Sequence, residues 1–248
     1  MPAPRTVWLL CAPSAEELVT TIRSRCRLVT LRTPPSAAVA EVLTADGVDP
    51  GTALTAARAA QGHIGRARRL ATDPEAARRR DEVLAVPARL TGIGEAFAAF
   101  TSAAAAETEA AAITEELDTP EREALRRAFG EGSTGKGVAK AVRGSAGAMK
   151  ELEDRQKSRA TRLKRDALDR ALLDLAAFYR DVLAVQLGAG VELASSGHER
   201  DVRKLAGASR PETTVRRIEA IMACRDRLEL SVAPLLAVEE MTLALAAH

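Results

Sequence analysis

The sequence predicts a mainly α-helical protein that begins with a short α/β segment. The chain has 248 residues, and 46% of them are hydrophobic, which is enough apolar material for a folded core. Ala, Leu, Arg and Glu, which are strong helix formers, are abundant. After Pro35, periodic apolar segments alternate with short connections containing Gly or Pro, a pattern typical of helical bundles.

The composition argues against several classes of protein. Lys plus Arg is 36 and Asp plus Glu is 34, so the net charge of +2 does not favour a globally basic nucleic-acid-binding protein. Aromatic residues make up only 2% of the chain, too few for a base-stacking sheet. No apolar run approaches 18 residues and the start has no signal-peptide pattern, so we expect no membrane contact.

The cysteines and histidines predict neither disulfides nor a metal site. They are widely spaced and form no C-x-x-C pair; they are Cys11, Cys26, Cys224, His63, His198 and His248. Without a disulfide framework the reducing cytosol is the default, so we expect a cytoplasmic protein. Because the histidines and cysteines lack the spacing of metal ligands, we expect no bound metal.

The first thirty residues have the pattern of a strand, a helix and a second strand. The apolar runs 7–11 and 28–31 predict buried strands, and 15–22 predicts a helix with Ser14 as its N-cap. A parallel sheet needs further strands and covered faces. We therefore expect these residues to be the end of a larger α/β domain whose front part the sequence lacks.

Helices are predicted for most of the remaining chain. Four short ones are bounded by Gly or Pro, and Asp73 caps the fourth; the ranges are 36–45, 50–60, 64–71 and 74–86. Longer ones are expected at 91–115, from Thr119-Pro120, at 152–187, after Pro211 and at 232–246. One apolar stripe is predicted within 152–187, formed by Leu168, Leu172, Leu175, Tyr179, Val182 and Leu183.

Residues 130–137 nearly match a phosphate-binding P-loop. However, Gly137 stands where the motif needs Ser or Thr to hold Mg²⁺, and a predicted helix precedes the segment instead of a strand. The segment is therefore interpreted as a flexible interhelical loop.

Two basic clusters are interpreted as solvated helix faces. Ten basic residues lie in 136–165, interrupted by acidic ones, and a phosphate-binding surface is the alternative interpretation there. The second cluster comprises Arg66, Arg68, Arg69 and Arg78–Arg80.

Residues 21–27 carry three arginines at alternate positions between a predicted helix and a predicted strand. A guanidinium offers a rigid fork of donors to phosphate oxygens, and an Arg supplied in trans can stabilise charge at a γ-phosphate. Surface charge is the equally weighted alternative. Cys26 is expected to be a small packed residue because no His is near enough in sequence to activate it.

Together these segments resemble the AAA+ sliding-clamp loaders, and among them the delta-prime family of bacterial DNA polymerase III. Residues 21–27 are similar to the Ser-Arg-Cys motif, 7–11 to the sensor-1 strand and 60–67 to the start of the sensor-2 helix. Residues 178–183 and 229–239 resemble two segments of the bacterial collar domain. The landmarks follow the family's order over essentially the whole chain.

The resemblance implies three parts and one functional arginine. Residues 1–33 would be the end of an AAA+ α/β domain, 34–86 a helical lid and 87–248 a helical collar used for oligomerisation. Arg25 would be an arginine finger acting in trans on ATP-Mg held by the neighbouring gamma/tau subunit. Arg23, Ser24 and Cys26 would support the motif.

The chain departs from the family pattern where ATP would be bound. The Walker segments would precede Met1, Ala12 occupies the sensor-1 position, and Gly65 occupies the sensor-2 position, with Arg66 one place late. We therefore expect no nucleotide bound by this chain and no intrinsic activity. It would be a component of a DNA-directed DNA polymerase, a nucleotidyltransferase holoenzyme.

The implied partners are the gamma/tau and delta clamp-loader subunits, with the sliding clamp and primed DNA engaged through the complex. One alternative is a stand-alone helical interaction module without ATP linkage. Another is a fragment of a different AAA+ protein, such as gamma/tau, a helicase loader or a Holliday-junction motor.

Overall fold

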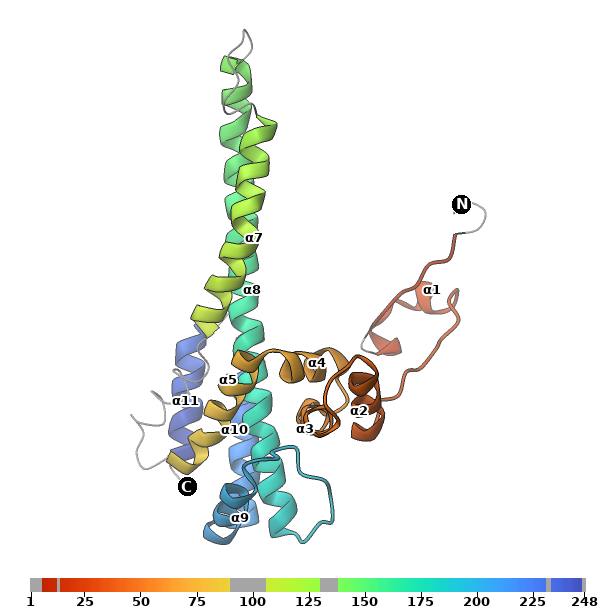
Figure 1. Cartoon of the computed structure of the whole chain (residues 1–248), viewed down its shortest axis with the longest axis vertical. Coiled ribbons are helices and arrows are strands. Elements are labelled where there is room, and N and C mark those ends of the chain that lie inside the picture. Colours follow the sequence, from red (N-terminus) through yellow and green to blue (C-terminus); the bar gives the residue numbers. More distant parts are fainter. Residues whose placement is uncertain (1–5, 13, 90–105, 130–137, 231–232, 247–248) are drawn as a thin grey trace. The chain divides into compact units, whose positions relative to one another are not determined.

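The structure is a computed structural model that describes residues 6–12, 14–89, 106–129, 138–230 and 233–246. The chain divides into two units, Met1–Pro34 and Pro35–His248. The described residues are mainly helical, which confirms the predicted helical class (Figure 1).

The first unit contains one turn of 3-10 helix, η1 (Ala15–Glu17), and one short helix, α1 (Thr20–Arg23). Ser14 Oγ accepts the backbone N–H of Glu16 at 3.2 Å, which confirms the predicted N-cap. The single helix predicted at 15–22 is wrong, because Leu18 and Val19 have extended-type ψ angles of 135° and 137° and separate the two pieces.

The strands predicted at 7–11 and 28–31 are also wrong. Neither segment has regular secondary structure, and Val7, Leu9 and Leu31 are 82%, 88% and 87% exposed. A strand forms only when a neighbour accepts and donates its backbone hydrogen bonds, and the described part of the chain contains no such neighbour. The expected end of an α/β sheet is therefore not formed in these residues.

The second unit begins with three short helices around a small core. They are α2 (Ser36–Ala45), α3 (Pro50–Ala60) and α4 (Ile64–Thr72), close to the predicted ranges. The turns between them use Gly47 and Gly62 at positive φ, +92° and +89°. The core is mostly alanine, which lets the helices approach closely; it contains Val39, Leu43, Ala53, Ala57, Ala60 and Ala67.

Helix α5 (Pro74–Ala85) continues into a 3-10 turn, η2 (Val86–Arg89). Asp73 Oδ1 accepts the backbone N–H groups of Glu75 at 3.0 Å and Ala76 at 3.2 Å, which confirms the predicted cap. Val83, Leu84 and Val86 are buried in a second, larger core that also contains residues of α8 (Val138–Gln186). Helix α5 therefore belongs to the larger core.

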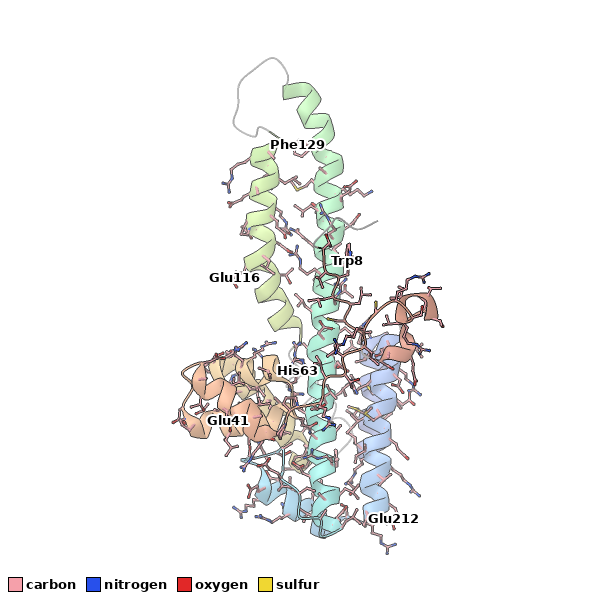
Figure 2. The ribbon with its side chains drawn as sticks, turned by 90° about the vertical axis from the view of Figure 1, so that its right-hand side faces the viewer. Trp8, Glu41, His63, Glu116, Phe129 and Glu212 are labelled. Atoms are coloured by element: carbon pink, nitrogen blue, oxygen red, sulfur yellow. The ribbon has the colours of Figure 1, made fainter. Side chains whose placement is uncertain are left out.

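Helix α7 (Ala106–Ala128) lies along α8 (Figure 1, Figure 2). It continues through Pro120, so the helix start predicted at Thr119-Pro120 is wrong. Contacts with α8 flank the proline: Gln156 Nε2 donates to the Asp118 carbonyl at 3.2 Å, and Arg159 Nη1 donates to Glu121 Oε1 at 3.0 Å. These bonds stabilise the helix on both sides of Pro120, which has no backbone N–H to donate.

The loop predicted at 130–137 and the part of the helix predicted at 91–105 lie outside the described residues.

Three further helices are described in the second unit: α9 (Glu199–Ala208), α10 (Pro211–Glu229) and α11 (Pro234–Ala246). The sequence did not predict α9. The apolar stripe predicted on α8 is confirmed in large part, since Leu172, Leu175, Tyr179 and Val182 are buried against side chains of α10 and α11. None of the helices among the described residues combines the length and apolarity needed to cross a membrane.

Candidate functional site

Arg25 lies in the turn that ends α1. Its backbone N–H donates to the Ile22 carbonyl at 3.0 Å, and its Nη1 donates to the Thr21 carbonyl at 2.9 Å. Ser24 Oγ donates to the same carbonyl at 3.3 Å. The last carbonyls of a helix have no intrahelical donor and carry partial negative charge, so they attract a cation. The bond from Nη1 thus holds the guanidinium end of the Arg25 side chain against the carbonyl end of its own helix, while the residue stays exposed.

The other residues of this segment are exposed as well. Arg23, Ser24, Cys26 and Arg27 all face solvent within the first unit. The prediction that Cys26 is packed is therefore wrong: the turn has no core of its own to cover the thiol, which is free. Arg23 and Arg27 therefore add two exposed positive charges on either side of Arg25.

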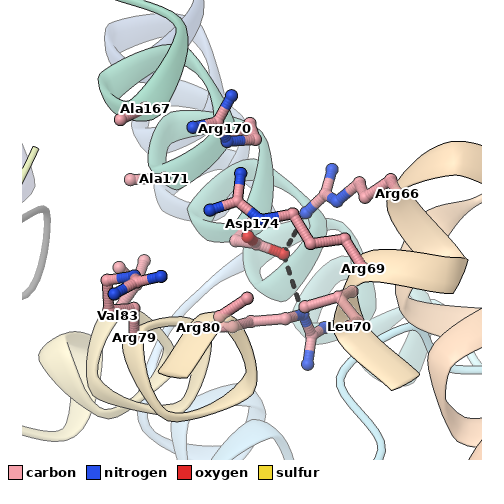
Figure 3. Close-up of a pocket in the computed structure, with 11 residues that line it drawn as sticks. Arg66, Arg69, Leu70, Arg79, Arg80, Val83, Ala167, Arg170, Ala171 and Asp174 are labelled. Atoms are coloured by element: carbon pink, nitrogen blue, oxygen red, sulfur yellow. Dashed lines mark hydrogen bonds and ion pairs between the residues drawn. The ribbon is translucent and has the colours of Figure 1, made fainter. Parts of the chain in front are cut away.

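Arg66, the residue next to the sensor-2-like position, is bound within its own unit. Its Nη2 pairs with Asp174 Oδ1 on α8, and Arg80 Nε on α5 donates to the same oxygen at 2.9 Å (Figure 3). Asp174 and Arg80 are buried and Arg66 is half-buried. A buried carboxylate is stable only when it is paired and hydrogen-bonded, and two guanidinium groups satisfy this one.

The interpretation of the cluster Arg66, Arg68, Arg69 and Arg78–Arg80 as a solvated face is thus wrong for part of the cluster. Arg68 and Arg78 are exposed and pair with surface carboxylates, at 2.6 Å from Asp46 and 2.8 Å from Glu75. Arg66 and Arg80 instead face α8. The signal missed in the sequence is Asp174, a carboxylate inside an apolar stripe, where an unpaired charge would be costly.

A second buried carboxylate holds the loop between α8 and α9. Asp181 Oδ2 accepts the backbone N–H of Ser195 at 2.7 Å, and Arg180 Nε donates to Asp181 Oδ1 at 3.1 Å. Arg80 Nη2 also donates to the Ala194 carbonyl at 3.0 Å. Arg80 therefore connects this loop to Asp174 and α8.

His63, His198 and the buried Cys224 all have structural surroundings that account for them. His63 Nδ1 accepts the backbone N–H of Arg66 at 3.1 Å and so caps α4. His198 lies 3.5 Å from Asp81 and 3.7 Å from Asp201. Burial raises the pKa of Cys224 to about 11. In the part of the chain that the structure describes, no three His, Cys, Asp or Glu side chains are grouped so as to hold a metal ion.

No family model, curated protein or solved structure matches this chain. Among the residues described above, the groups best placed to bind a ligand or partner are guanidinium groups, which are exposed at Arg25 and buried at Arg80.

Proposed function

We propose that the chain is a delta-prime-like subunit of a bacterial DNA polymerase III clamp loader. In this role it is a stator that supplies Arg25 in trans to ATP-Mg on a neighbouring gamma/tau subunit. The ATP-driven complex loads the sliding clamp onto primed DNA. The observation that carries the proposal is the exposed Arg25 side chain, oriented by the Thr21 carbonyl at the end of α1.

The chemistry of Arg25 suits this role. A guanidinium has five N–H donors, and among the described residues Arg25 uses only Nη1, for the Thr21 carbonyl. The remaining donors are available for the phosphate oxygens of ATP held by the neighbouring subunit. A guanidinium placed this way stabilises the charge that develops when a γ-phosphate is transferred to water.

The apolar residues of the first unit support an α/β context for this turn. Val7, Leu9, Val29 and Leu31 are all more than two-thirds exposed in the described structure. Apolar β-preferring side chains of this kind are suited to burial between a sheet and its covering helices. In the proposed complex these apolar side chains are covered by other protein surfaces.

The environment of Arg66 supports a role without intrinsic ATP hydrolysis. Its guanidinium is bound to Asp174, so the side chain next to the sensor-2-like position already neutralises a carboxylate of its own chain. In the proposed complex, hydrolysis is carried out by gamma/tau, and this chain binds no nucleotide of its own.

The second unit supplies the proposed collar. Leu235 and Leu236 of α11 are 64% and 61% exposed, and Leu243 lies further along the same helix, also exposed. Apolar side chains on a terminal helix are suited to packing against the helices of other subunits.

The same leucines favour a second candidate, a helical interaction module without ATP linkage. In that module the bond from Arg25 to the Thr21 carbonyl would serve only to end α1. The two candidates predict different effects of changing Arg25.

The experiment is reconstitution of the chain with gamma/tau and delta subunits, followed by measurement of ATPase activity stimulated by clamp and primed DNA. Arg25→Ala should leave assembly intact and lower the stimulated rate by about a thousandfold per affected site, the range measured for arginine fingers. Arg25→Lys should be nearly as impaired, because an ammonium lacks the planar fork.

Arg32→Ala is the matched control, since Arg32 is also an exposed arginine of the first unit and lies outside the motif. It should retain wild-type activity. A complex that assembles but is indifferent to Arg25→Ala supports the interaction module. Failure to bind gamma/tau and delta contradicts the clamp-loader proposal.

A further inference from the structure

The second unit has two hydrophobic cores, and among the described residues the two cores have no member in common. The core of α2, α3 and α4, here called the small bundle, takes its members from residues 39–71. The core of α5, α8, α9, α10 and α11, here called the large bundle, takes its members from residues 83–245. The two bundles are therefore held together by contacts other than a shared core.

The chain joins the two bundles at a single residue. Asp73 separates α4 from α5 and has an extended backbone, with φ −111° and ψ 101°. Pro74, which begins α5, has no backbone N–H and disfavours the helical conformation at the residue before it. The helix breaks at Asp73, so a change in the dihedral angles of this residue would turn one bundle against the other.

Charged side chains bridge the bundles away from this joint. Arg66 of α4 pairs with the buried Asp174 of α8, and Arg58 Nε of α3 donates to Glu192 Oε1, in the loop before α9, at 2.5 Å. A cavity of about 60 Å³ lies beside the first of these pairs, between α4, α5 and α8 (Figure 3). A polar interface that is incompletely packed allows the two sides to move as rigid bodies, which a continuous apolar core does not.

Asp174 has a second partner, which stays with the large bundle. Arg80 Nε of α5 donates at 2.9 Å to Asp174 Oδ1, the oxygen that also accepts from Arg66 (Figure 3). Arg80 Nη2 donates to the Ala194 carbonyl at 3.0 Å, which fixes this guanidinium in the large bundle. Release of Arg66 would therefore leave the carboxylate paired, without the cost of an isolated buried charge.

The two bridging arginines lie at the edge of the interface, where water can replace their carboxylates. The side chain of Arg66 is 17% exposed and that of Arg58 is 35% exposed. Partly exposed ion pairs of this kind contribute little net free energy, so they are readily broken. We propose that Arg66 and Arg58 form a releasable latch, and that the small bundle swings about Asp73 between a closed state and an open state.

The structure is the closed state, because both ion pairs of the latch are formed. The open state exchanges these pairs for water and keeps both hydrophobic cores intact. The latch belongs to the second unit alone, so it does not depend on the role proposed for Arg25.

The test is the distance between spin labels on the two bundles, measured by pulsed electron paramagnetic resonance in the whole chain. Thr55→Cys on α3 and Lys204→Cys on α9 provide exposed attachment sites, and Cys11→Ser with Cys26→Ser removes the exposed native thiols. With the latch intact we expect one main distance. Arg66→Gln should add a longer distance and raise the open fraction about tenfold, the factor for losing one charge-assisted hydrogen bond.

Arg68→Gln is the matched control, because Arg68 lies on the same helix but pairs at 2.6 Å with Asp46, a residue that directly follows α2. It should leave the distance unchanged. Arg58→Gln is a second latch variant that removes only a partly exposed pair, so it should raise the open fraction by a smaller factor, about twofold.

Circular dichroism and urea denaturation check that each labelled variant is folded. A single unchanged distance in both latch variants would overturn the proposal. Equal open fractions in Arg66→Gln and Arg68→Gln would overturn it as well, since any lost ion pair of α4 would then have the same effect.

Discussion

Asp181 accepts the backbone N–H of Ser195 at 2.7 Å from a completely buried position on α8. The bond ties the loop before α9 to the centre of the larger core. Without it, a buried backbone donor would have no acceptor, which native structures avoid.

Asp181→Ala should lower the free energy of unfolding by about 3 kcal/mol, because it removes a charged acceptor and leaves the Ser195 N–H unsatisfied. Asp181→Asn should cost less, since an amide oxygen still accepts. Urea denaturation checks both, with the exposed Asp154→Asn as a neutral control. Equal midpoints for Asp181→Ala and the control would show that the bond is not stabilising.

Two arginines on α5, one buried and one exposed, test how much the buried contacts of Arg80 with Asp174 and Ala194 stabilise the fold. Arg80→Ala should destabilise the fold by about 3 kcal/mol, because Asp174 and the Ala194 carbonyl lose a buried donor. Arg78→Ala, two residues earlier and exposed between Glu75 and Glu82, should leave the denaturation midpoint unchanged. The reverse order of stabilities would contradict the assignment of Arg80 to the core.

Tyr179 makes stability fall at high pH. Burial raises the pKa of Tyr179 from 10.0 to about 12, although Arg217 opposes the shift. The native state therefore keeps this proton longer than the unfolded state does. The resulting stability is complete below about pH 10 and is lost as the pH rises through about 12.

Tyr179→Phe should remove this part of the pH dependence. The phenol oxygen has no hydrogen-bond partner among the described residues, so the variant should be as stable as wild type, or more stable, at neutral pH. Urea denaturation at pH 8 and pH 11 checks both points. If wild type and Tyr179→Phe lost the same free energy of unfolding between pH 8 and pH 11, Tyr179 would not be the group responsible for the pH dependence.

The three thiols should react at very different rates. Cys11 and Cys26 are exposed, whereas Cys224 is buried and its raised pKa of about 11 leaves little thiolate at pH 8. A chromogenic disulfide reagent should modify two thiols rapidly in native protein and the third only on unfolding in urea. Rapid modification of all three would contradict the burial of Cys224.

Local sequence signals located most of the short helices. Asp73 with Pro74 and the glycines at 47 and 62 act within one turn, so their effect does not depend on the rest of the fold. Helix α9 had comparable signals, with Glu199 and Asp201 in its first turn and Val202 and Leu205 on one face, and these were overlooked.

Features that depend on distant residues could not be predicted in this way. The runs at 7–11 and 28–31 have strand-like composition, but composition supplies no partner strand. Pro120 ends helices in isolation, yet contacts from α8 hold α7 together. Arg66 meets Asp174 across 108 positions, so no local pattern could pair them.

The span between Arg66 and Asp174 includes helix α7 and most of α8. The entropy of closing such a span grows only logarithmically with its length. Adding or removing whole turns in the paired α7 and α8 segments should therefore leave the ion pair between Arg66 and Asp174 intact. Length variation between homologues should concentrate there.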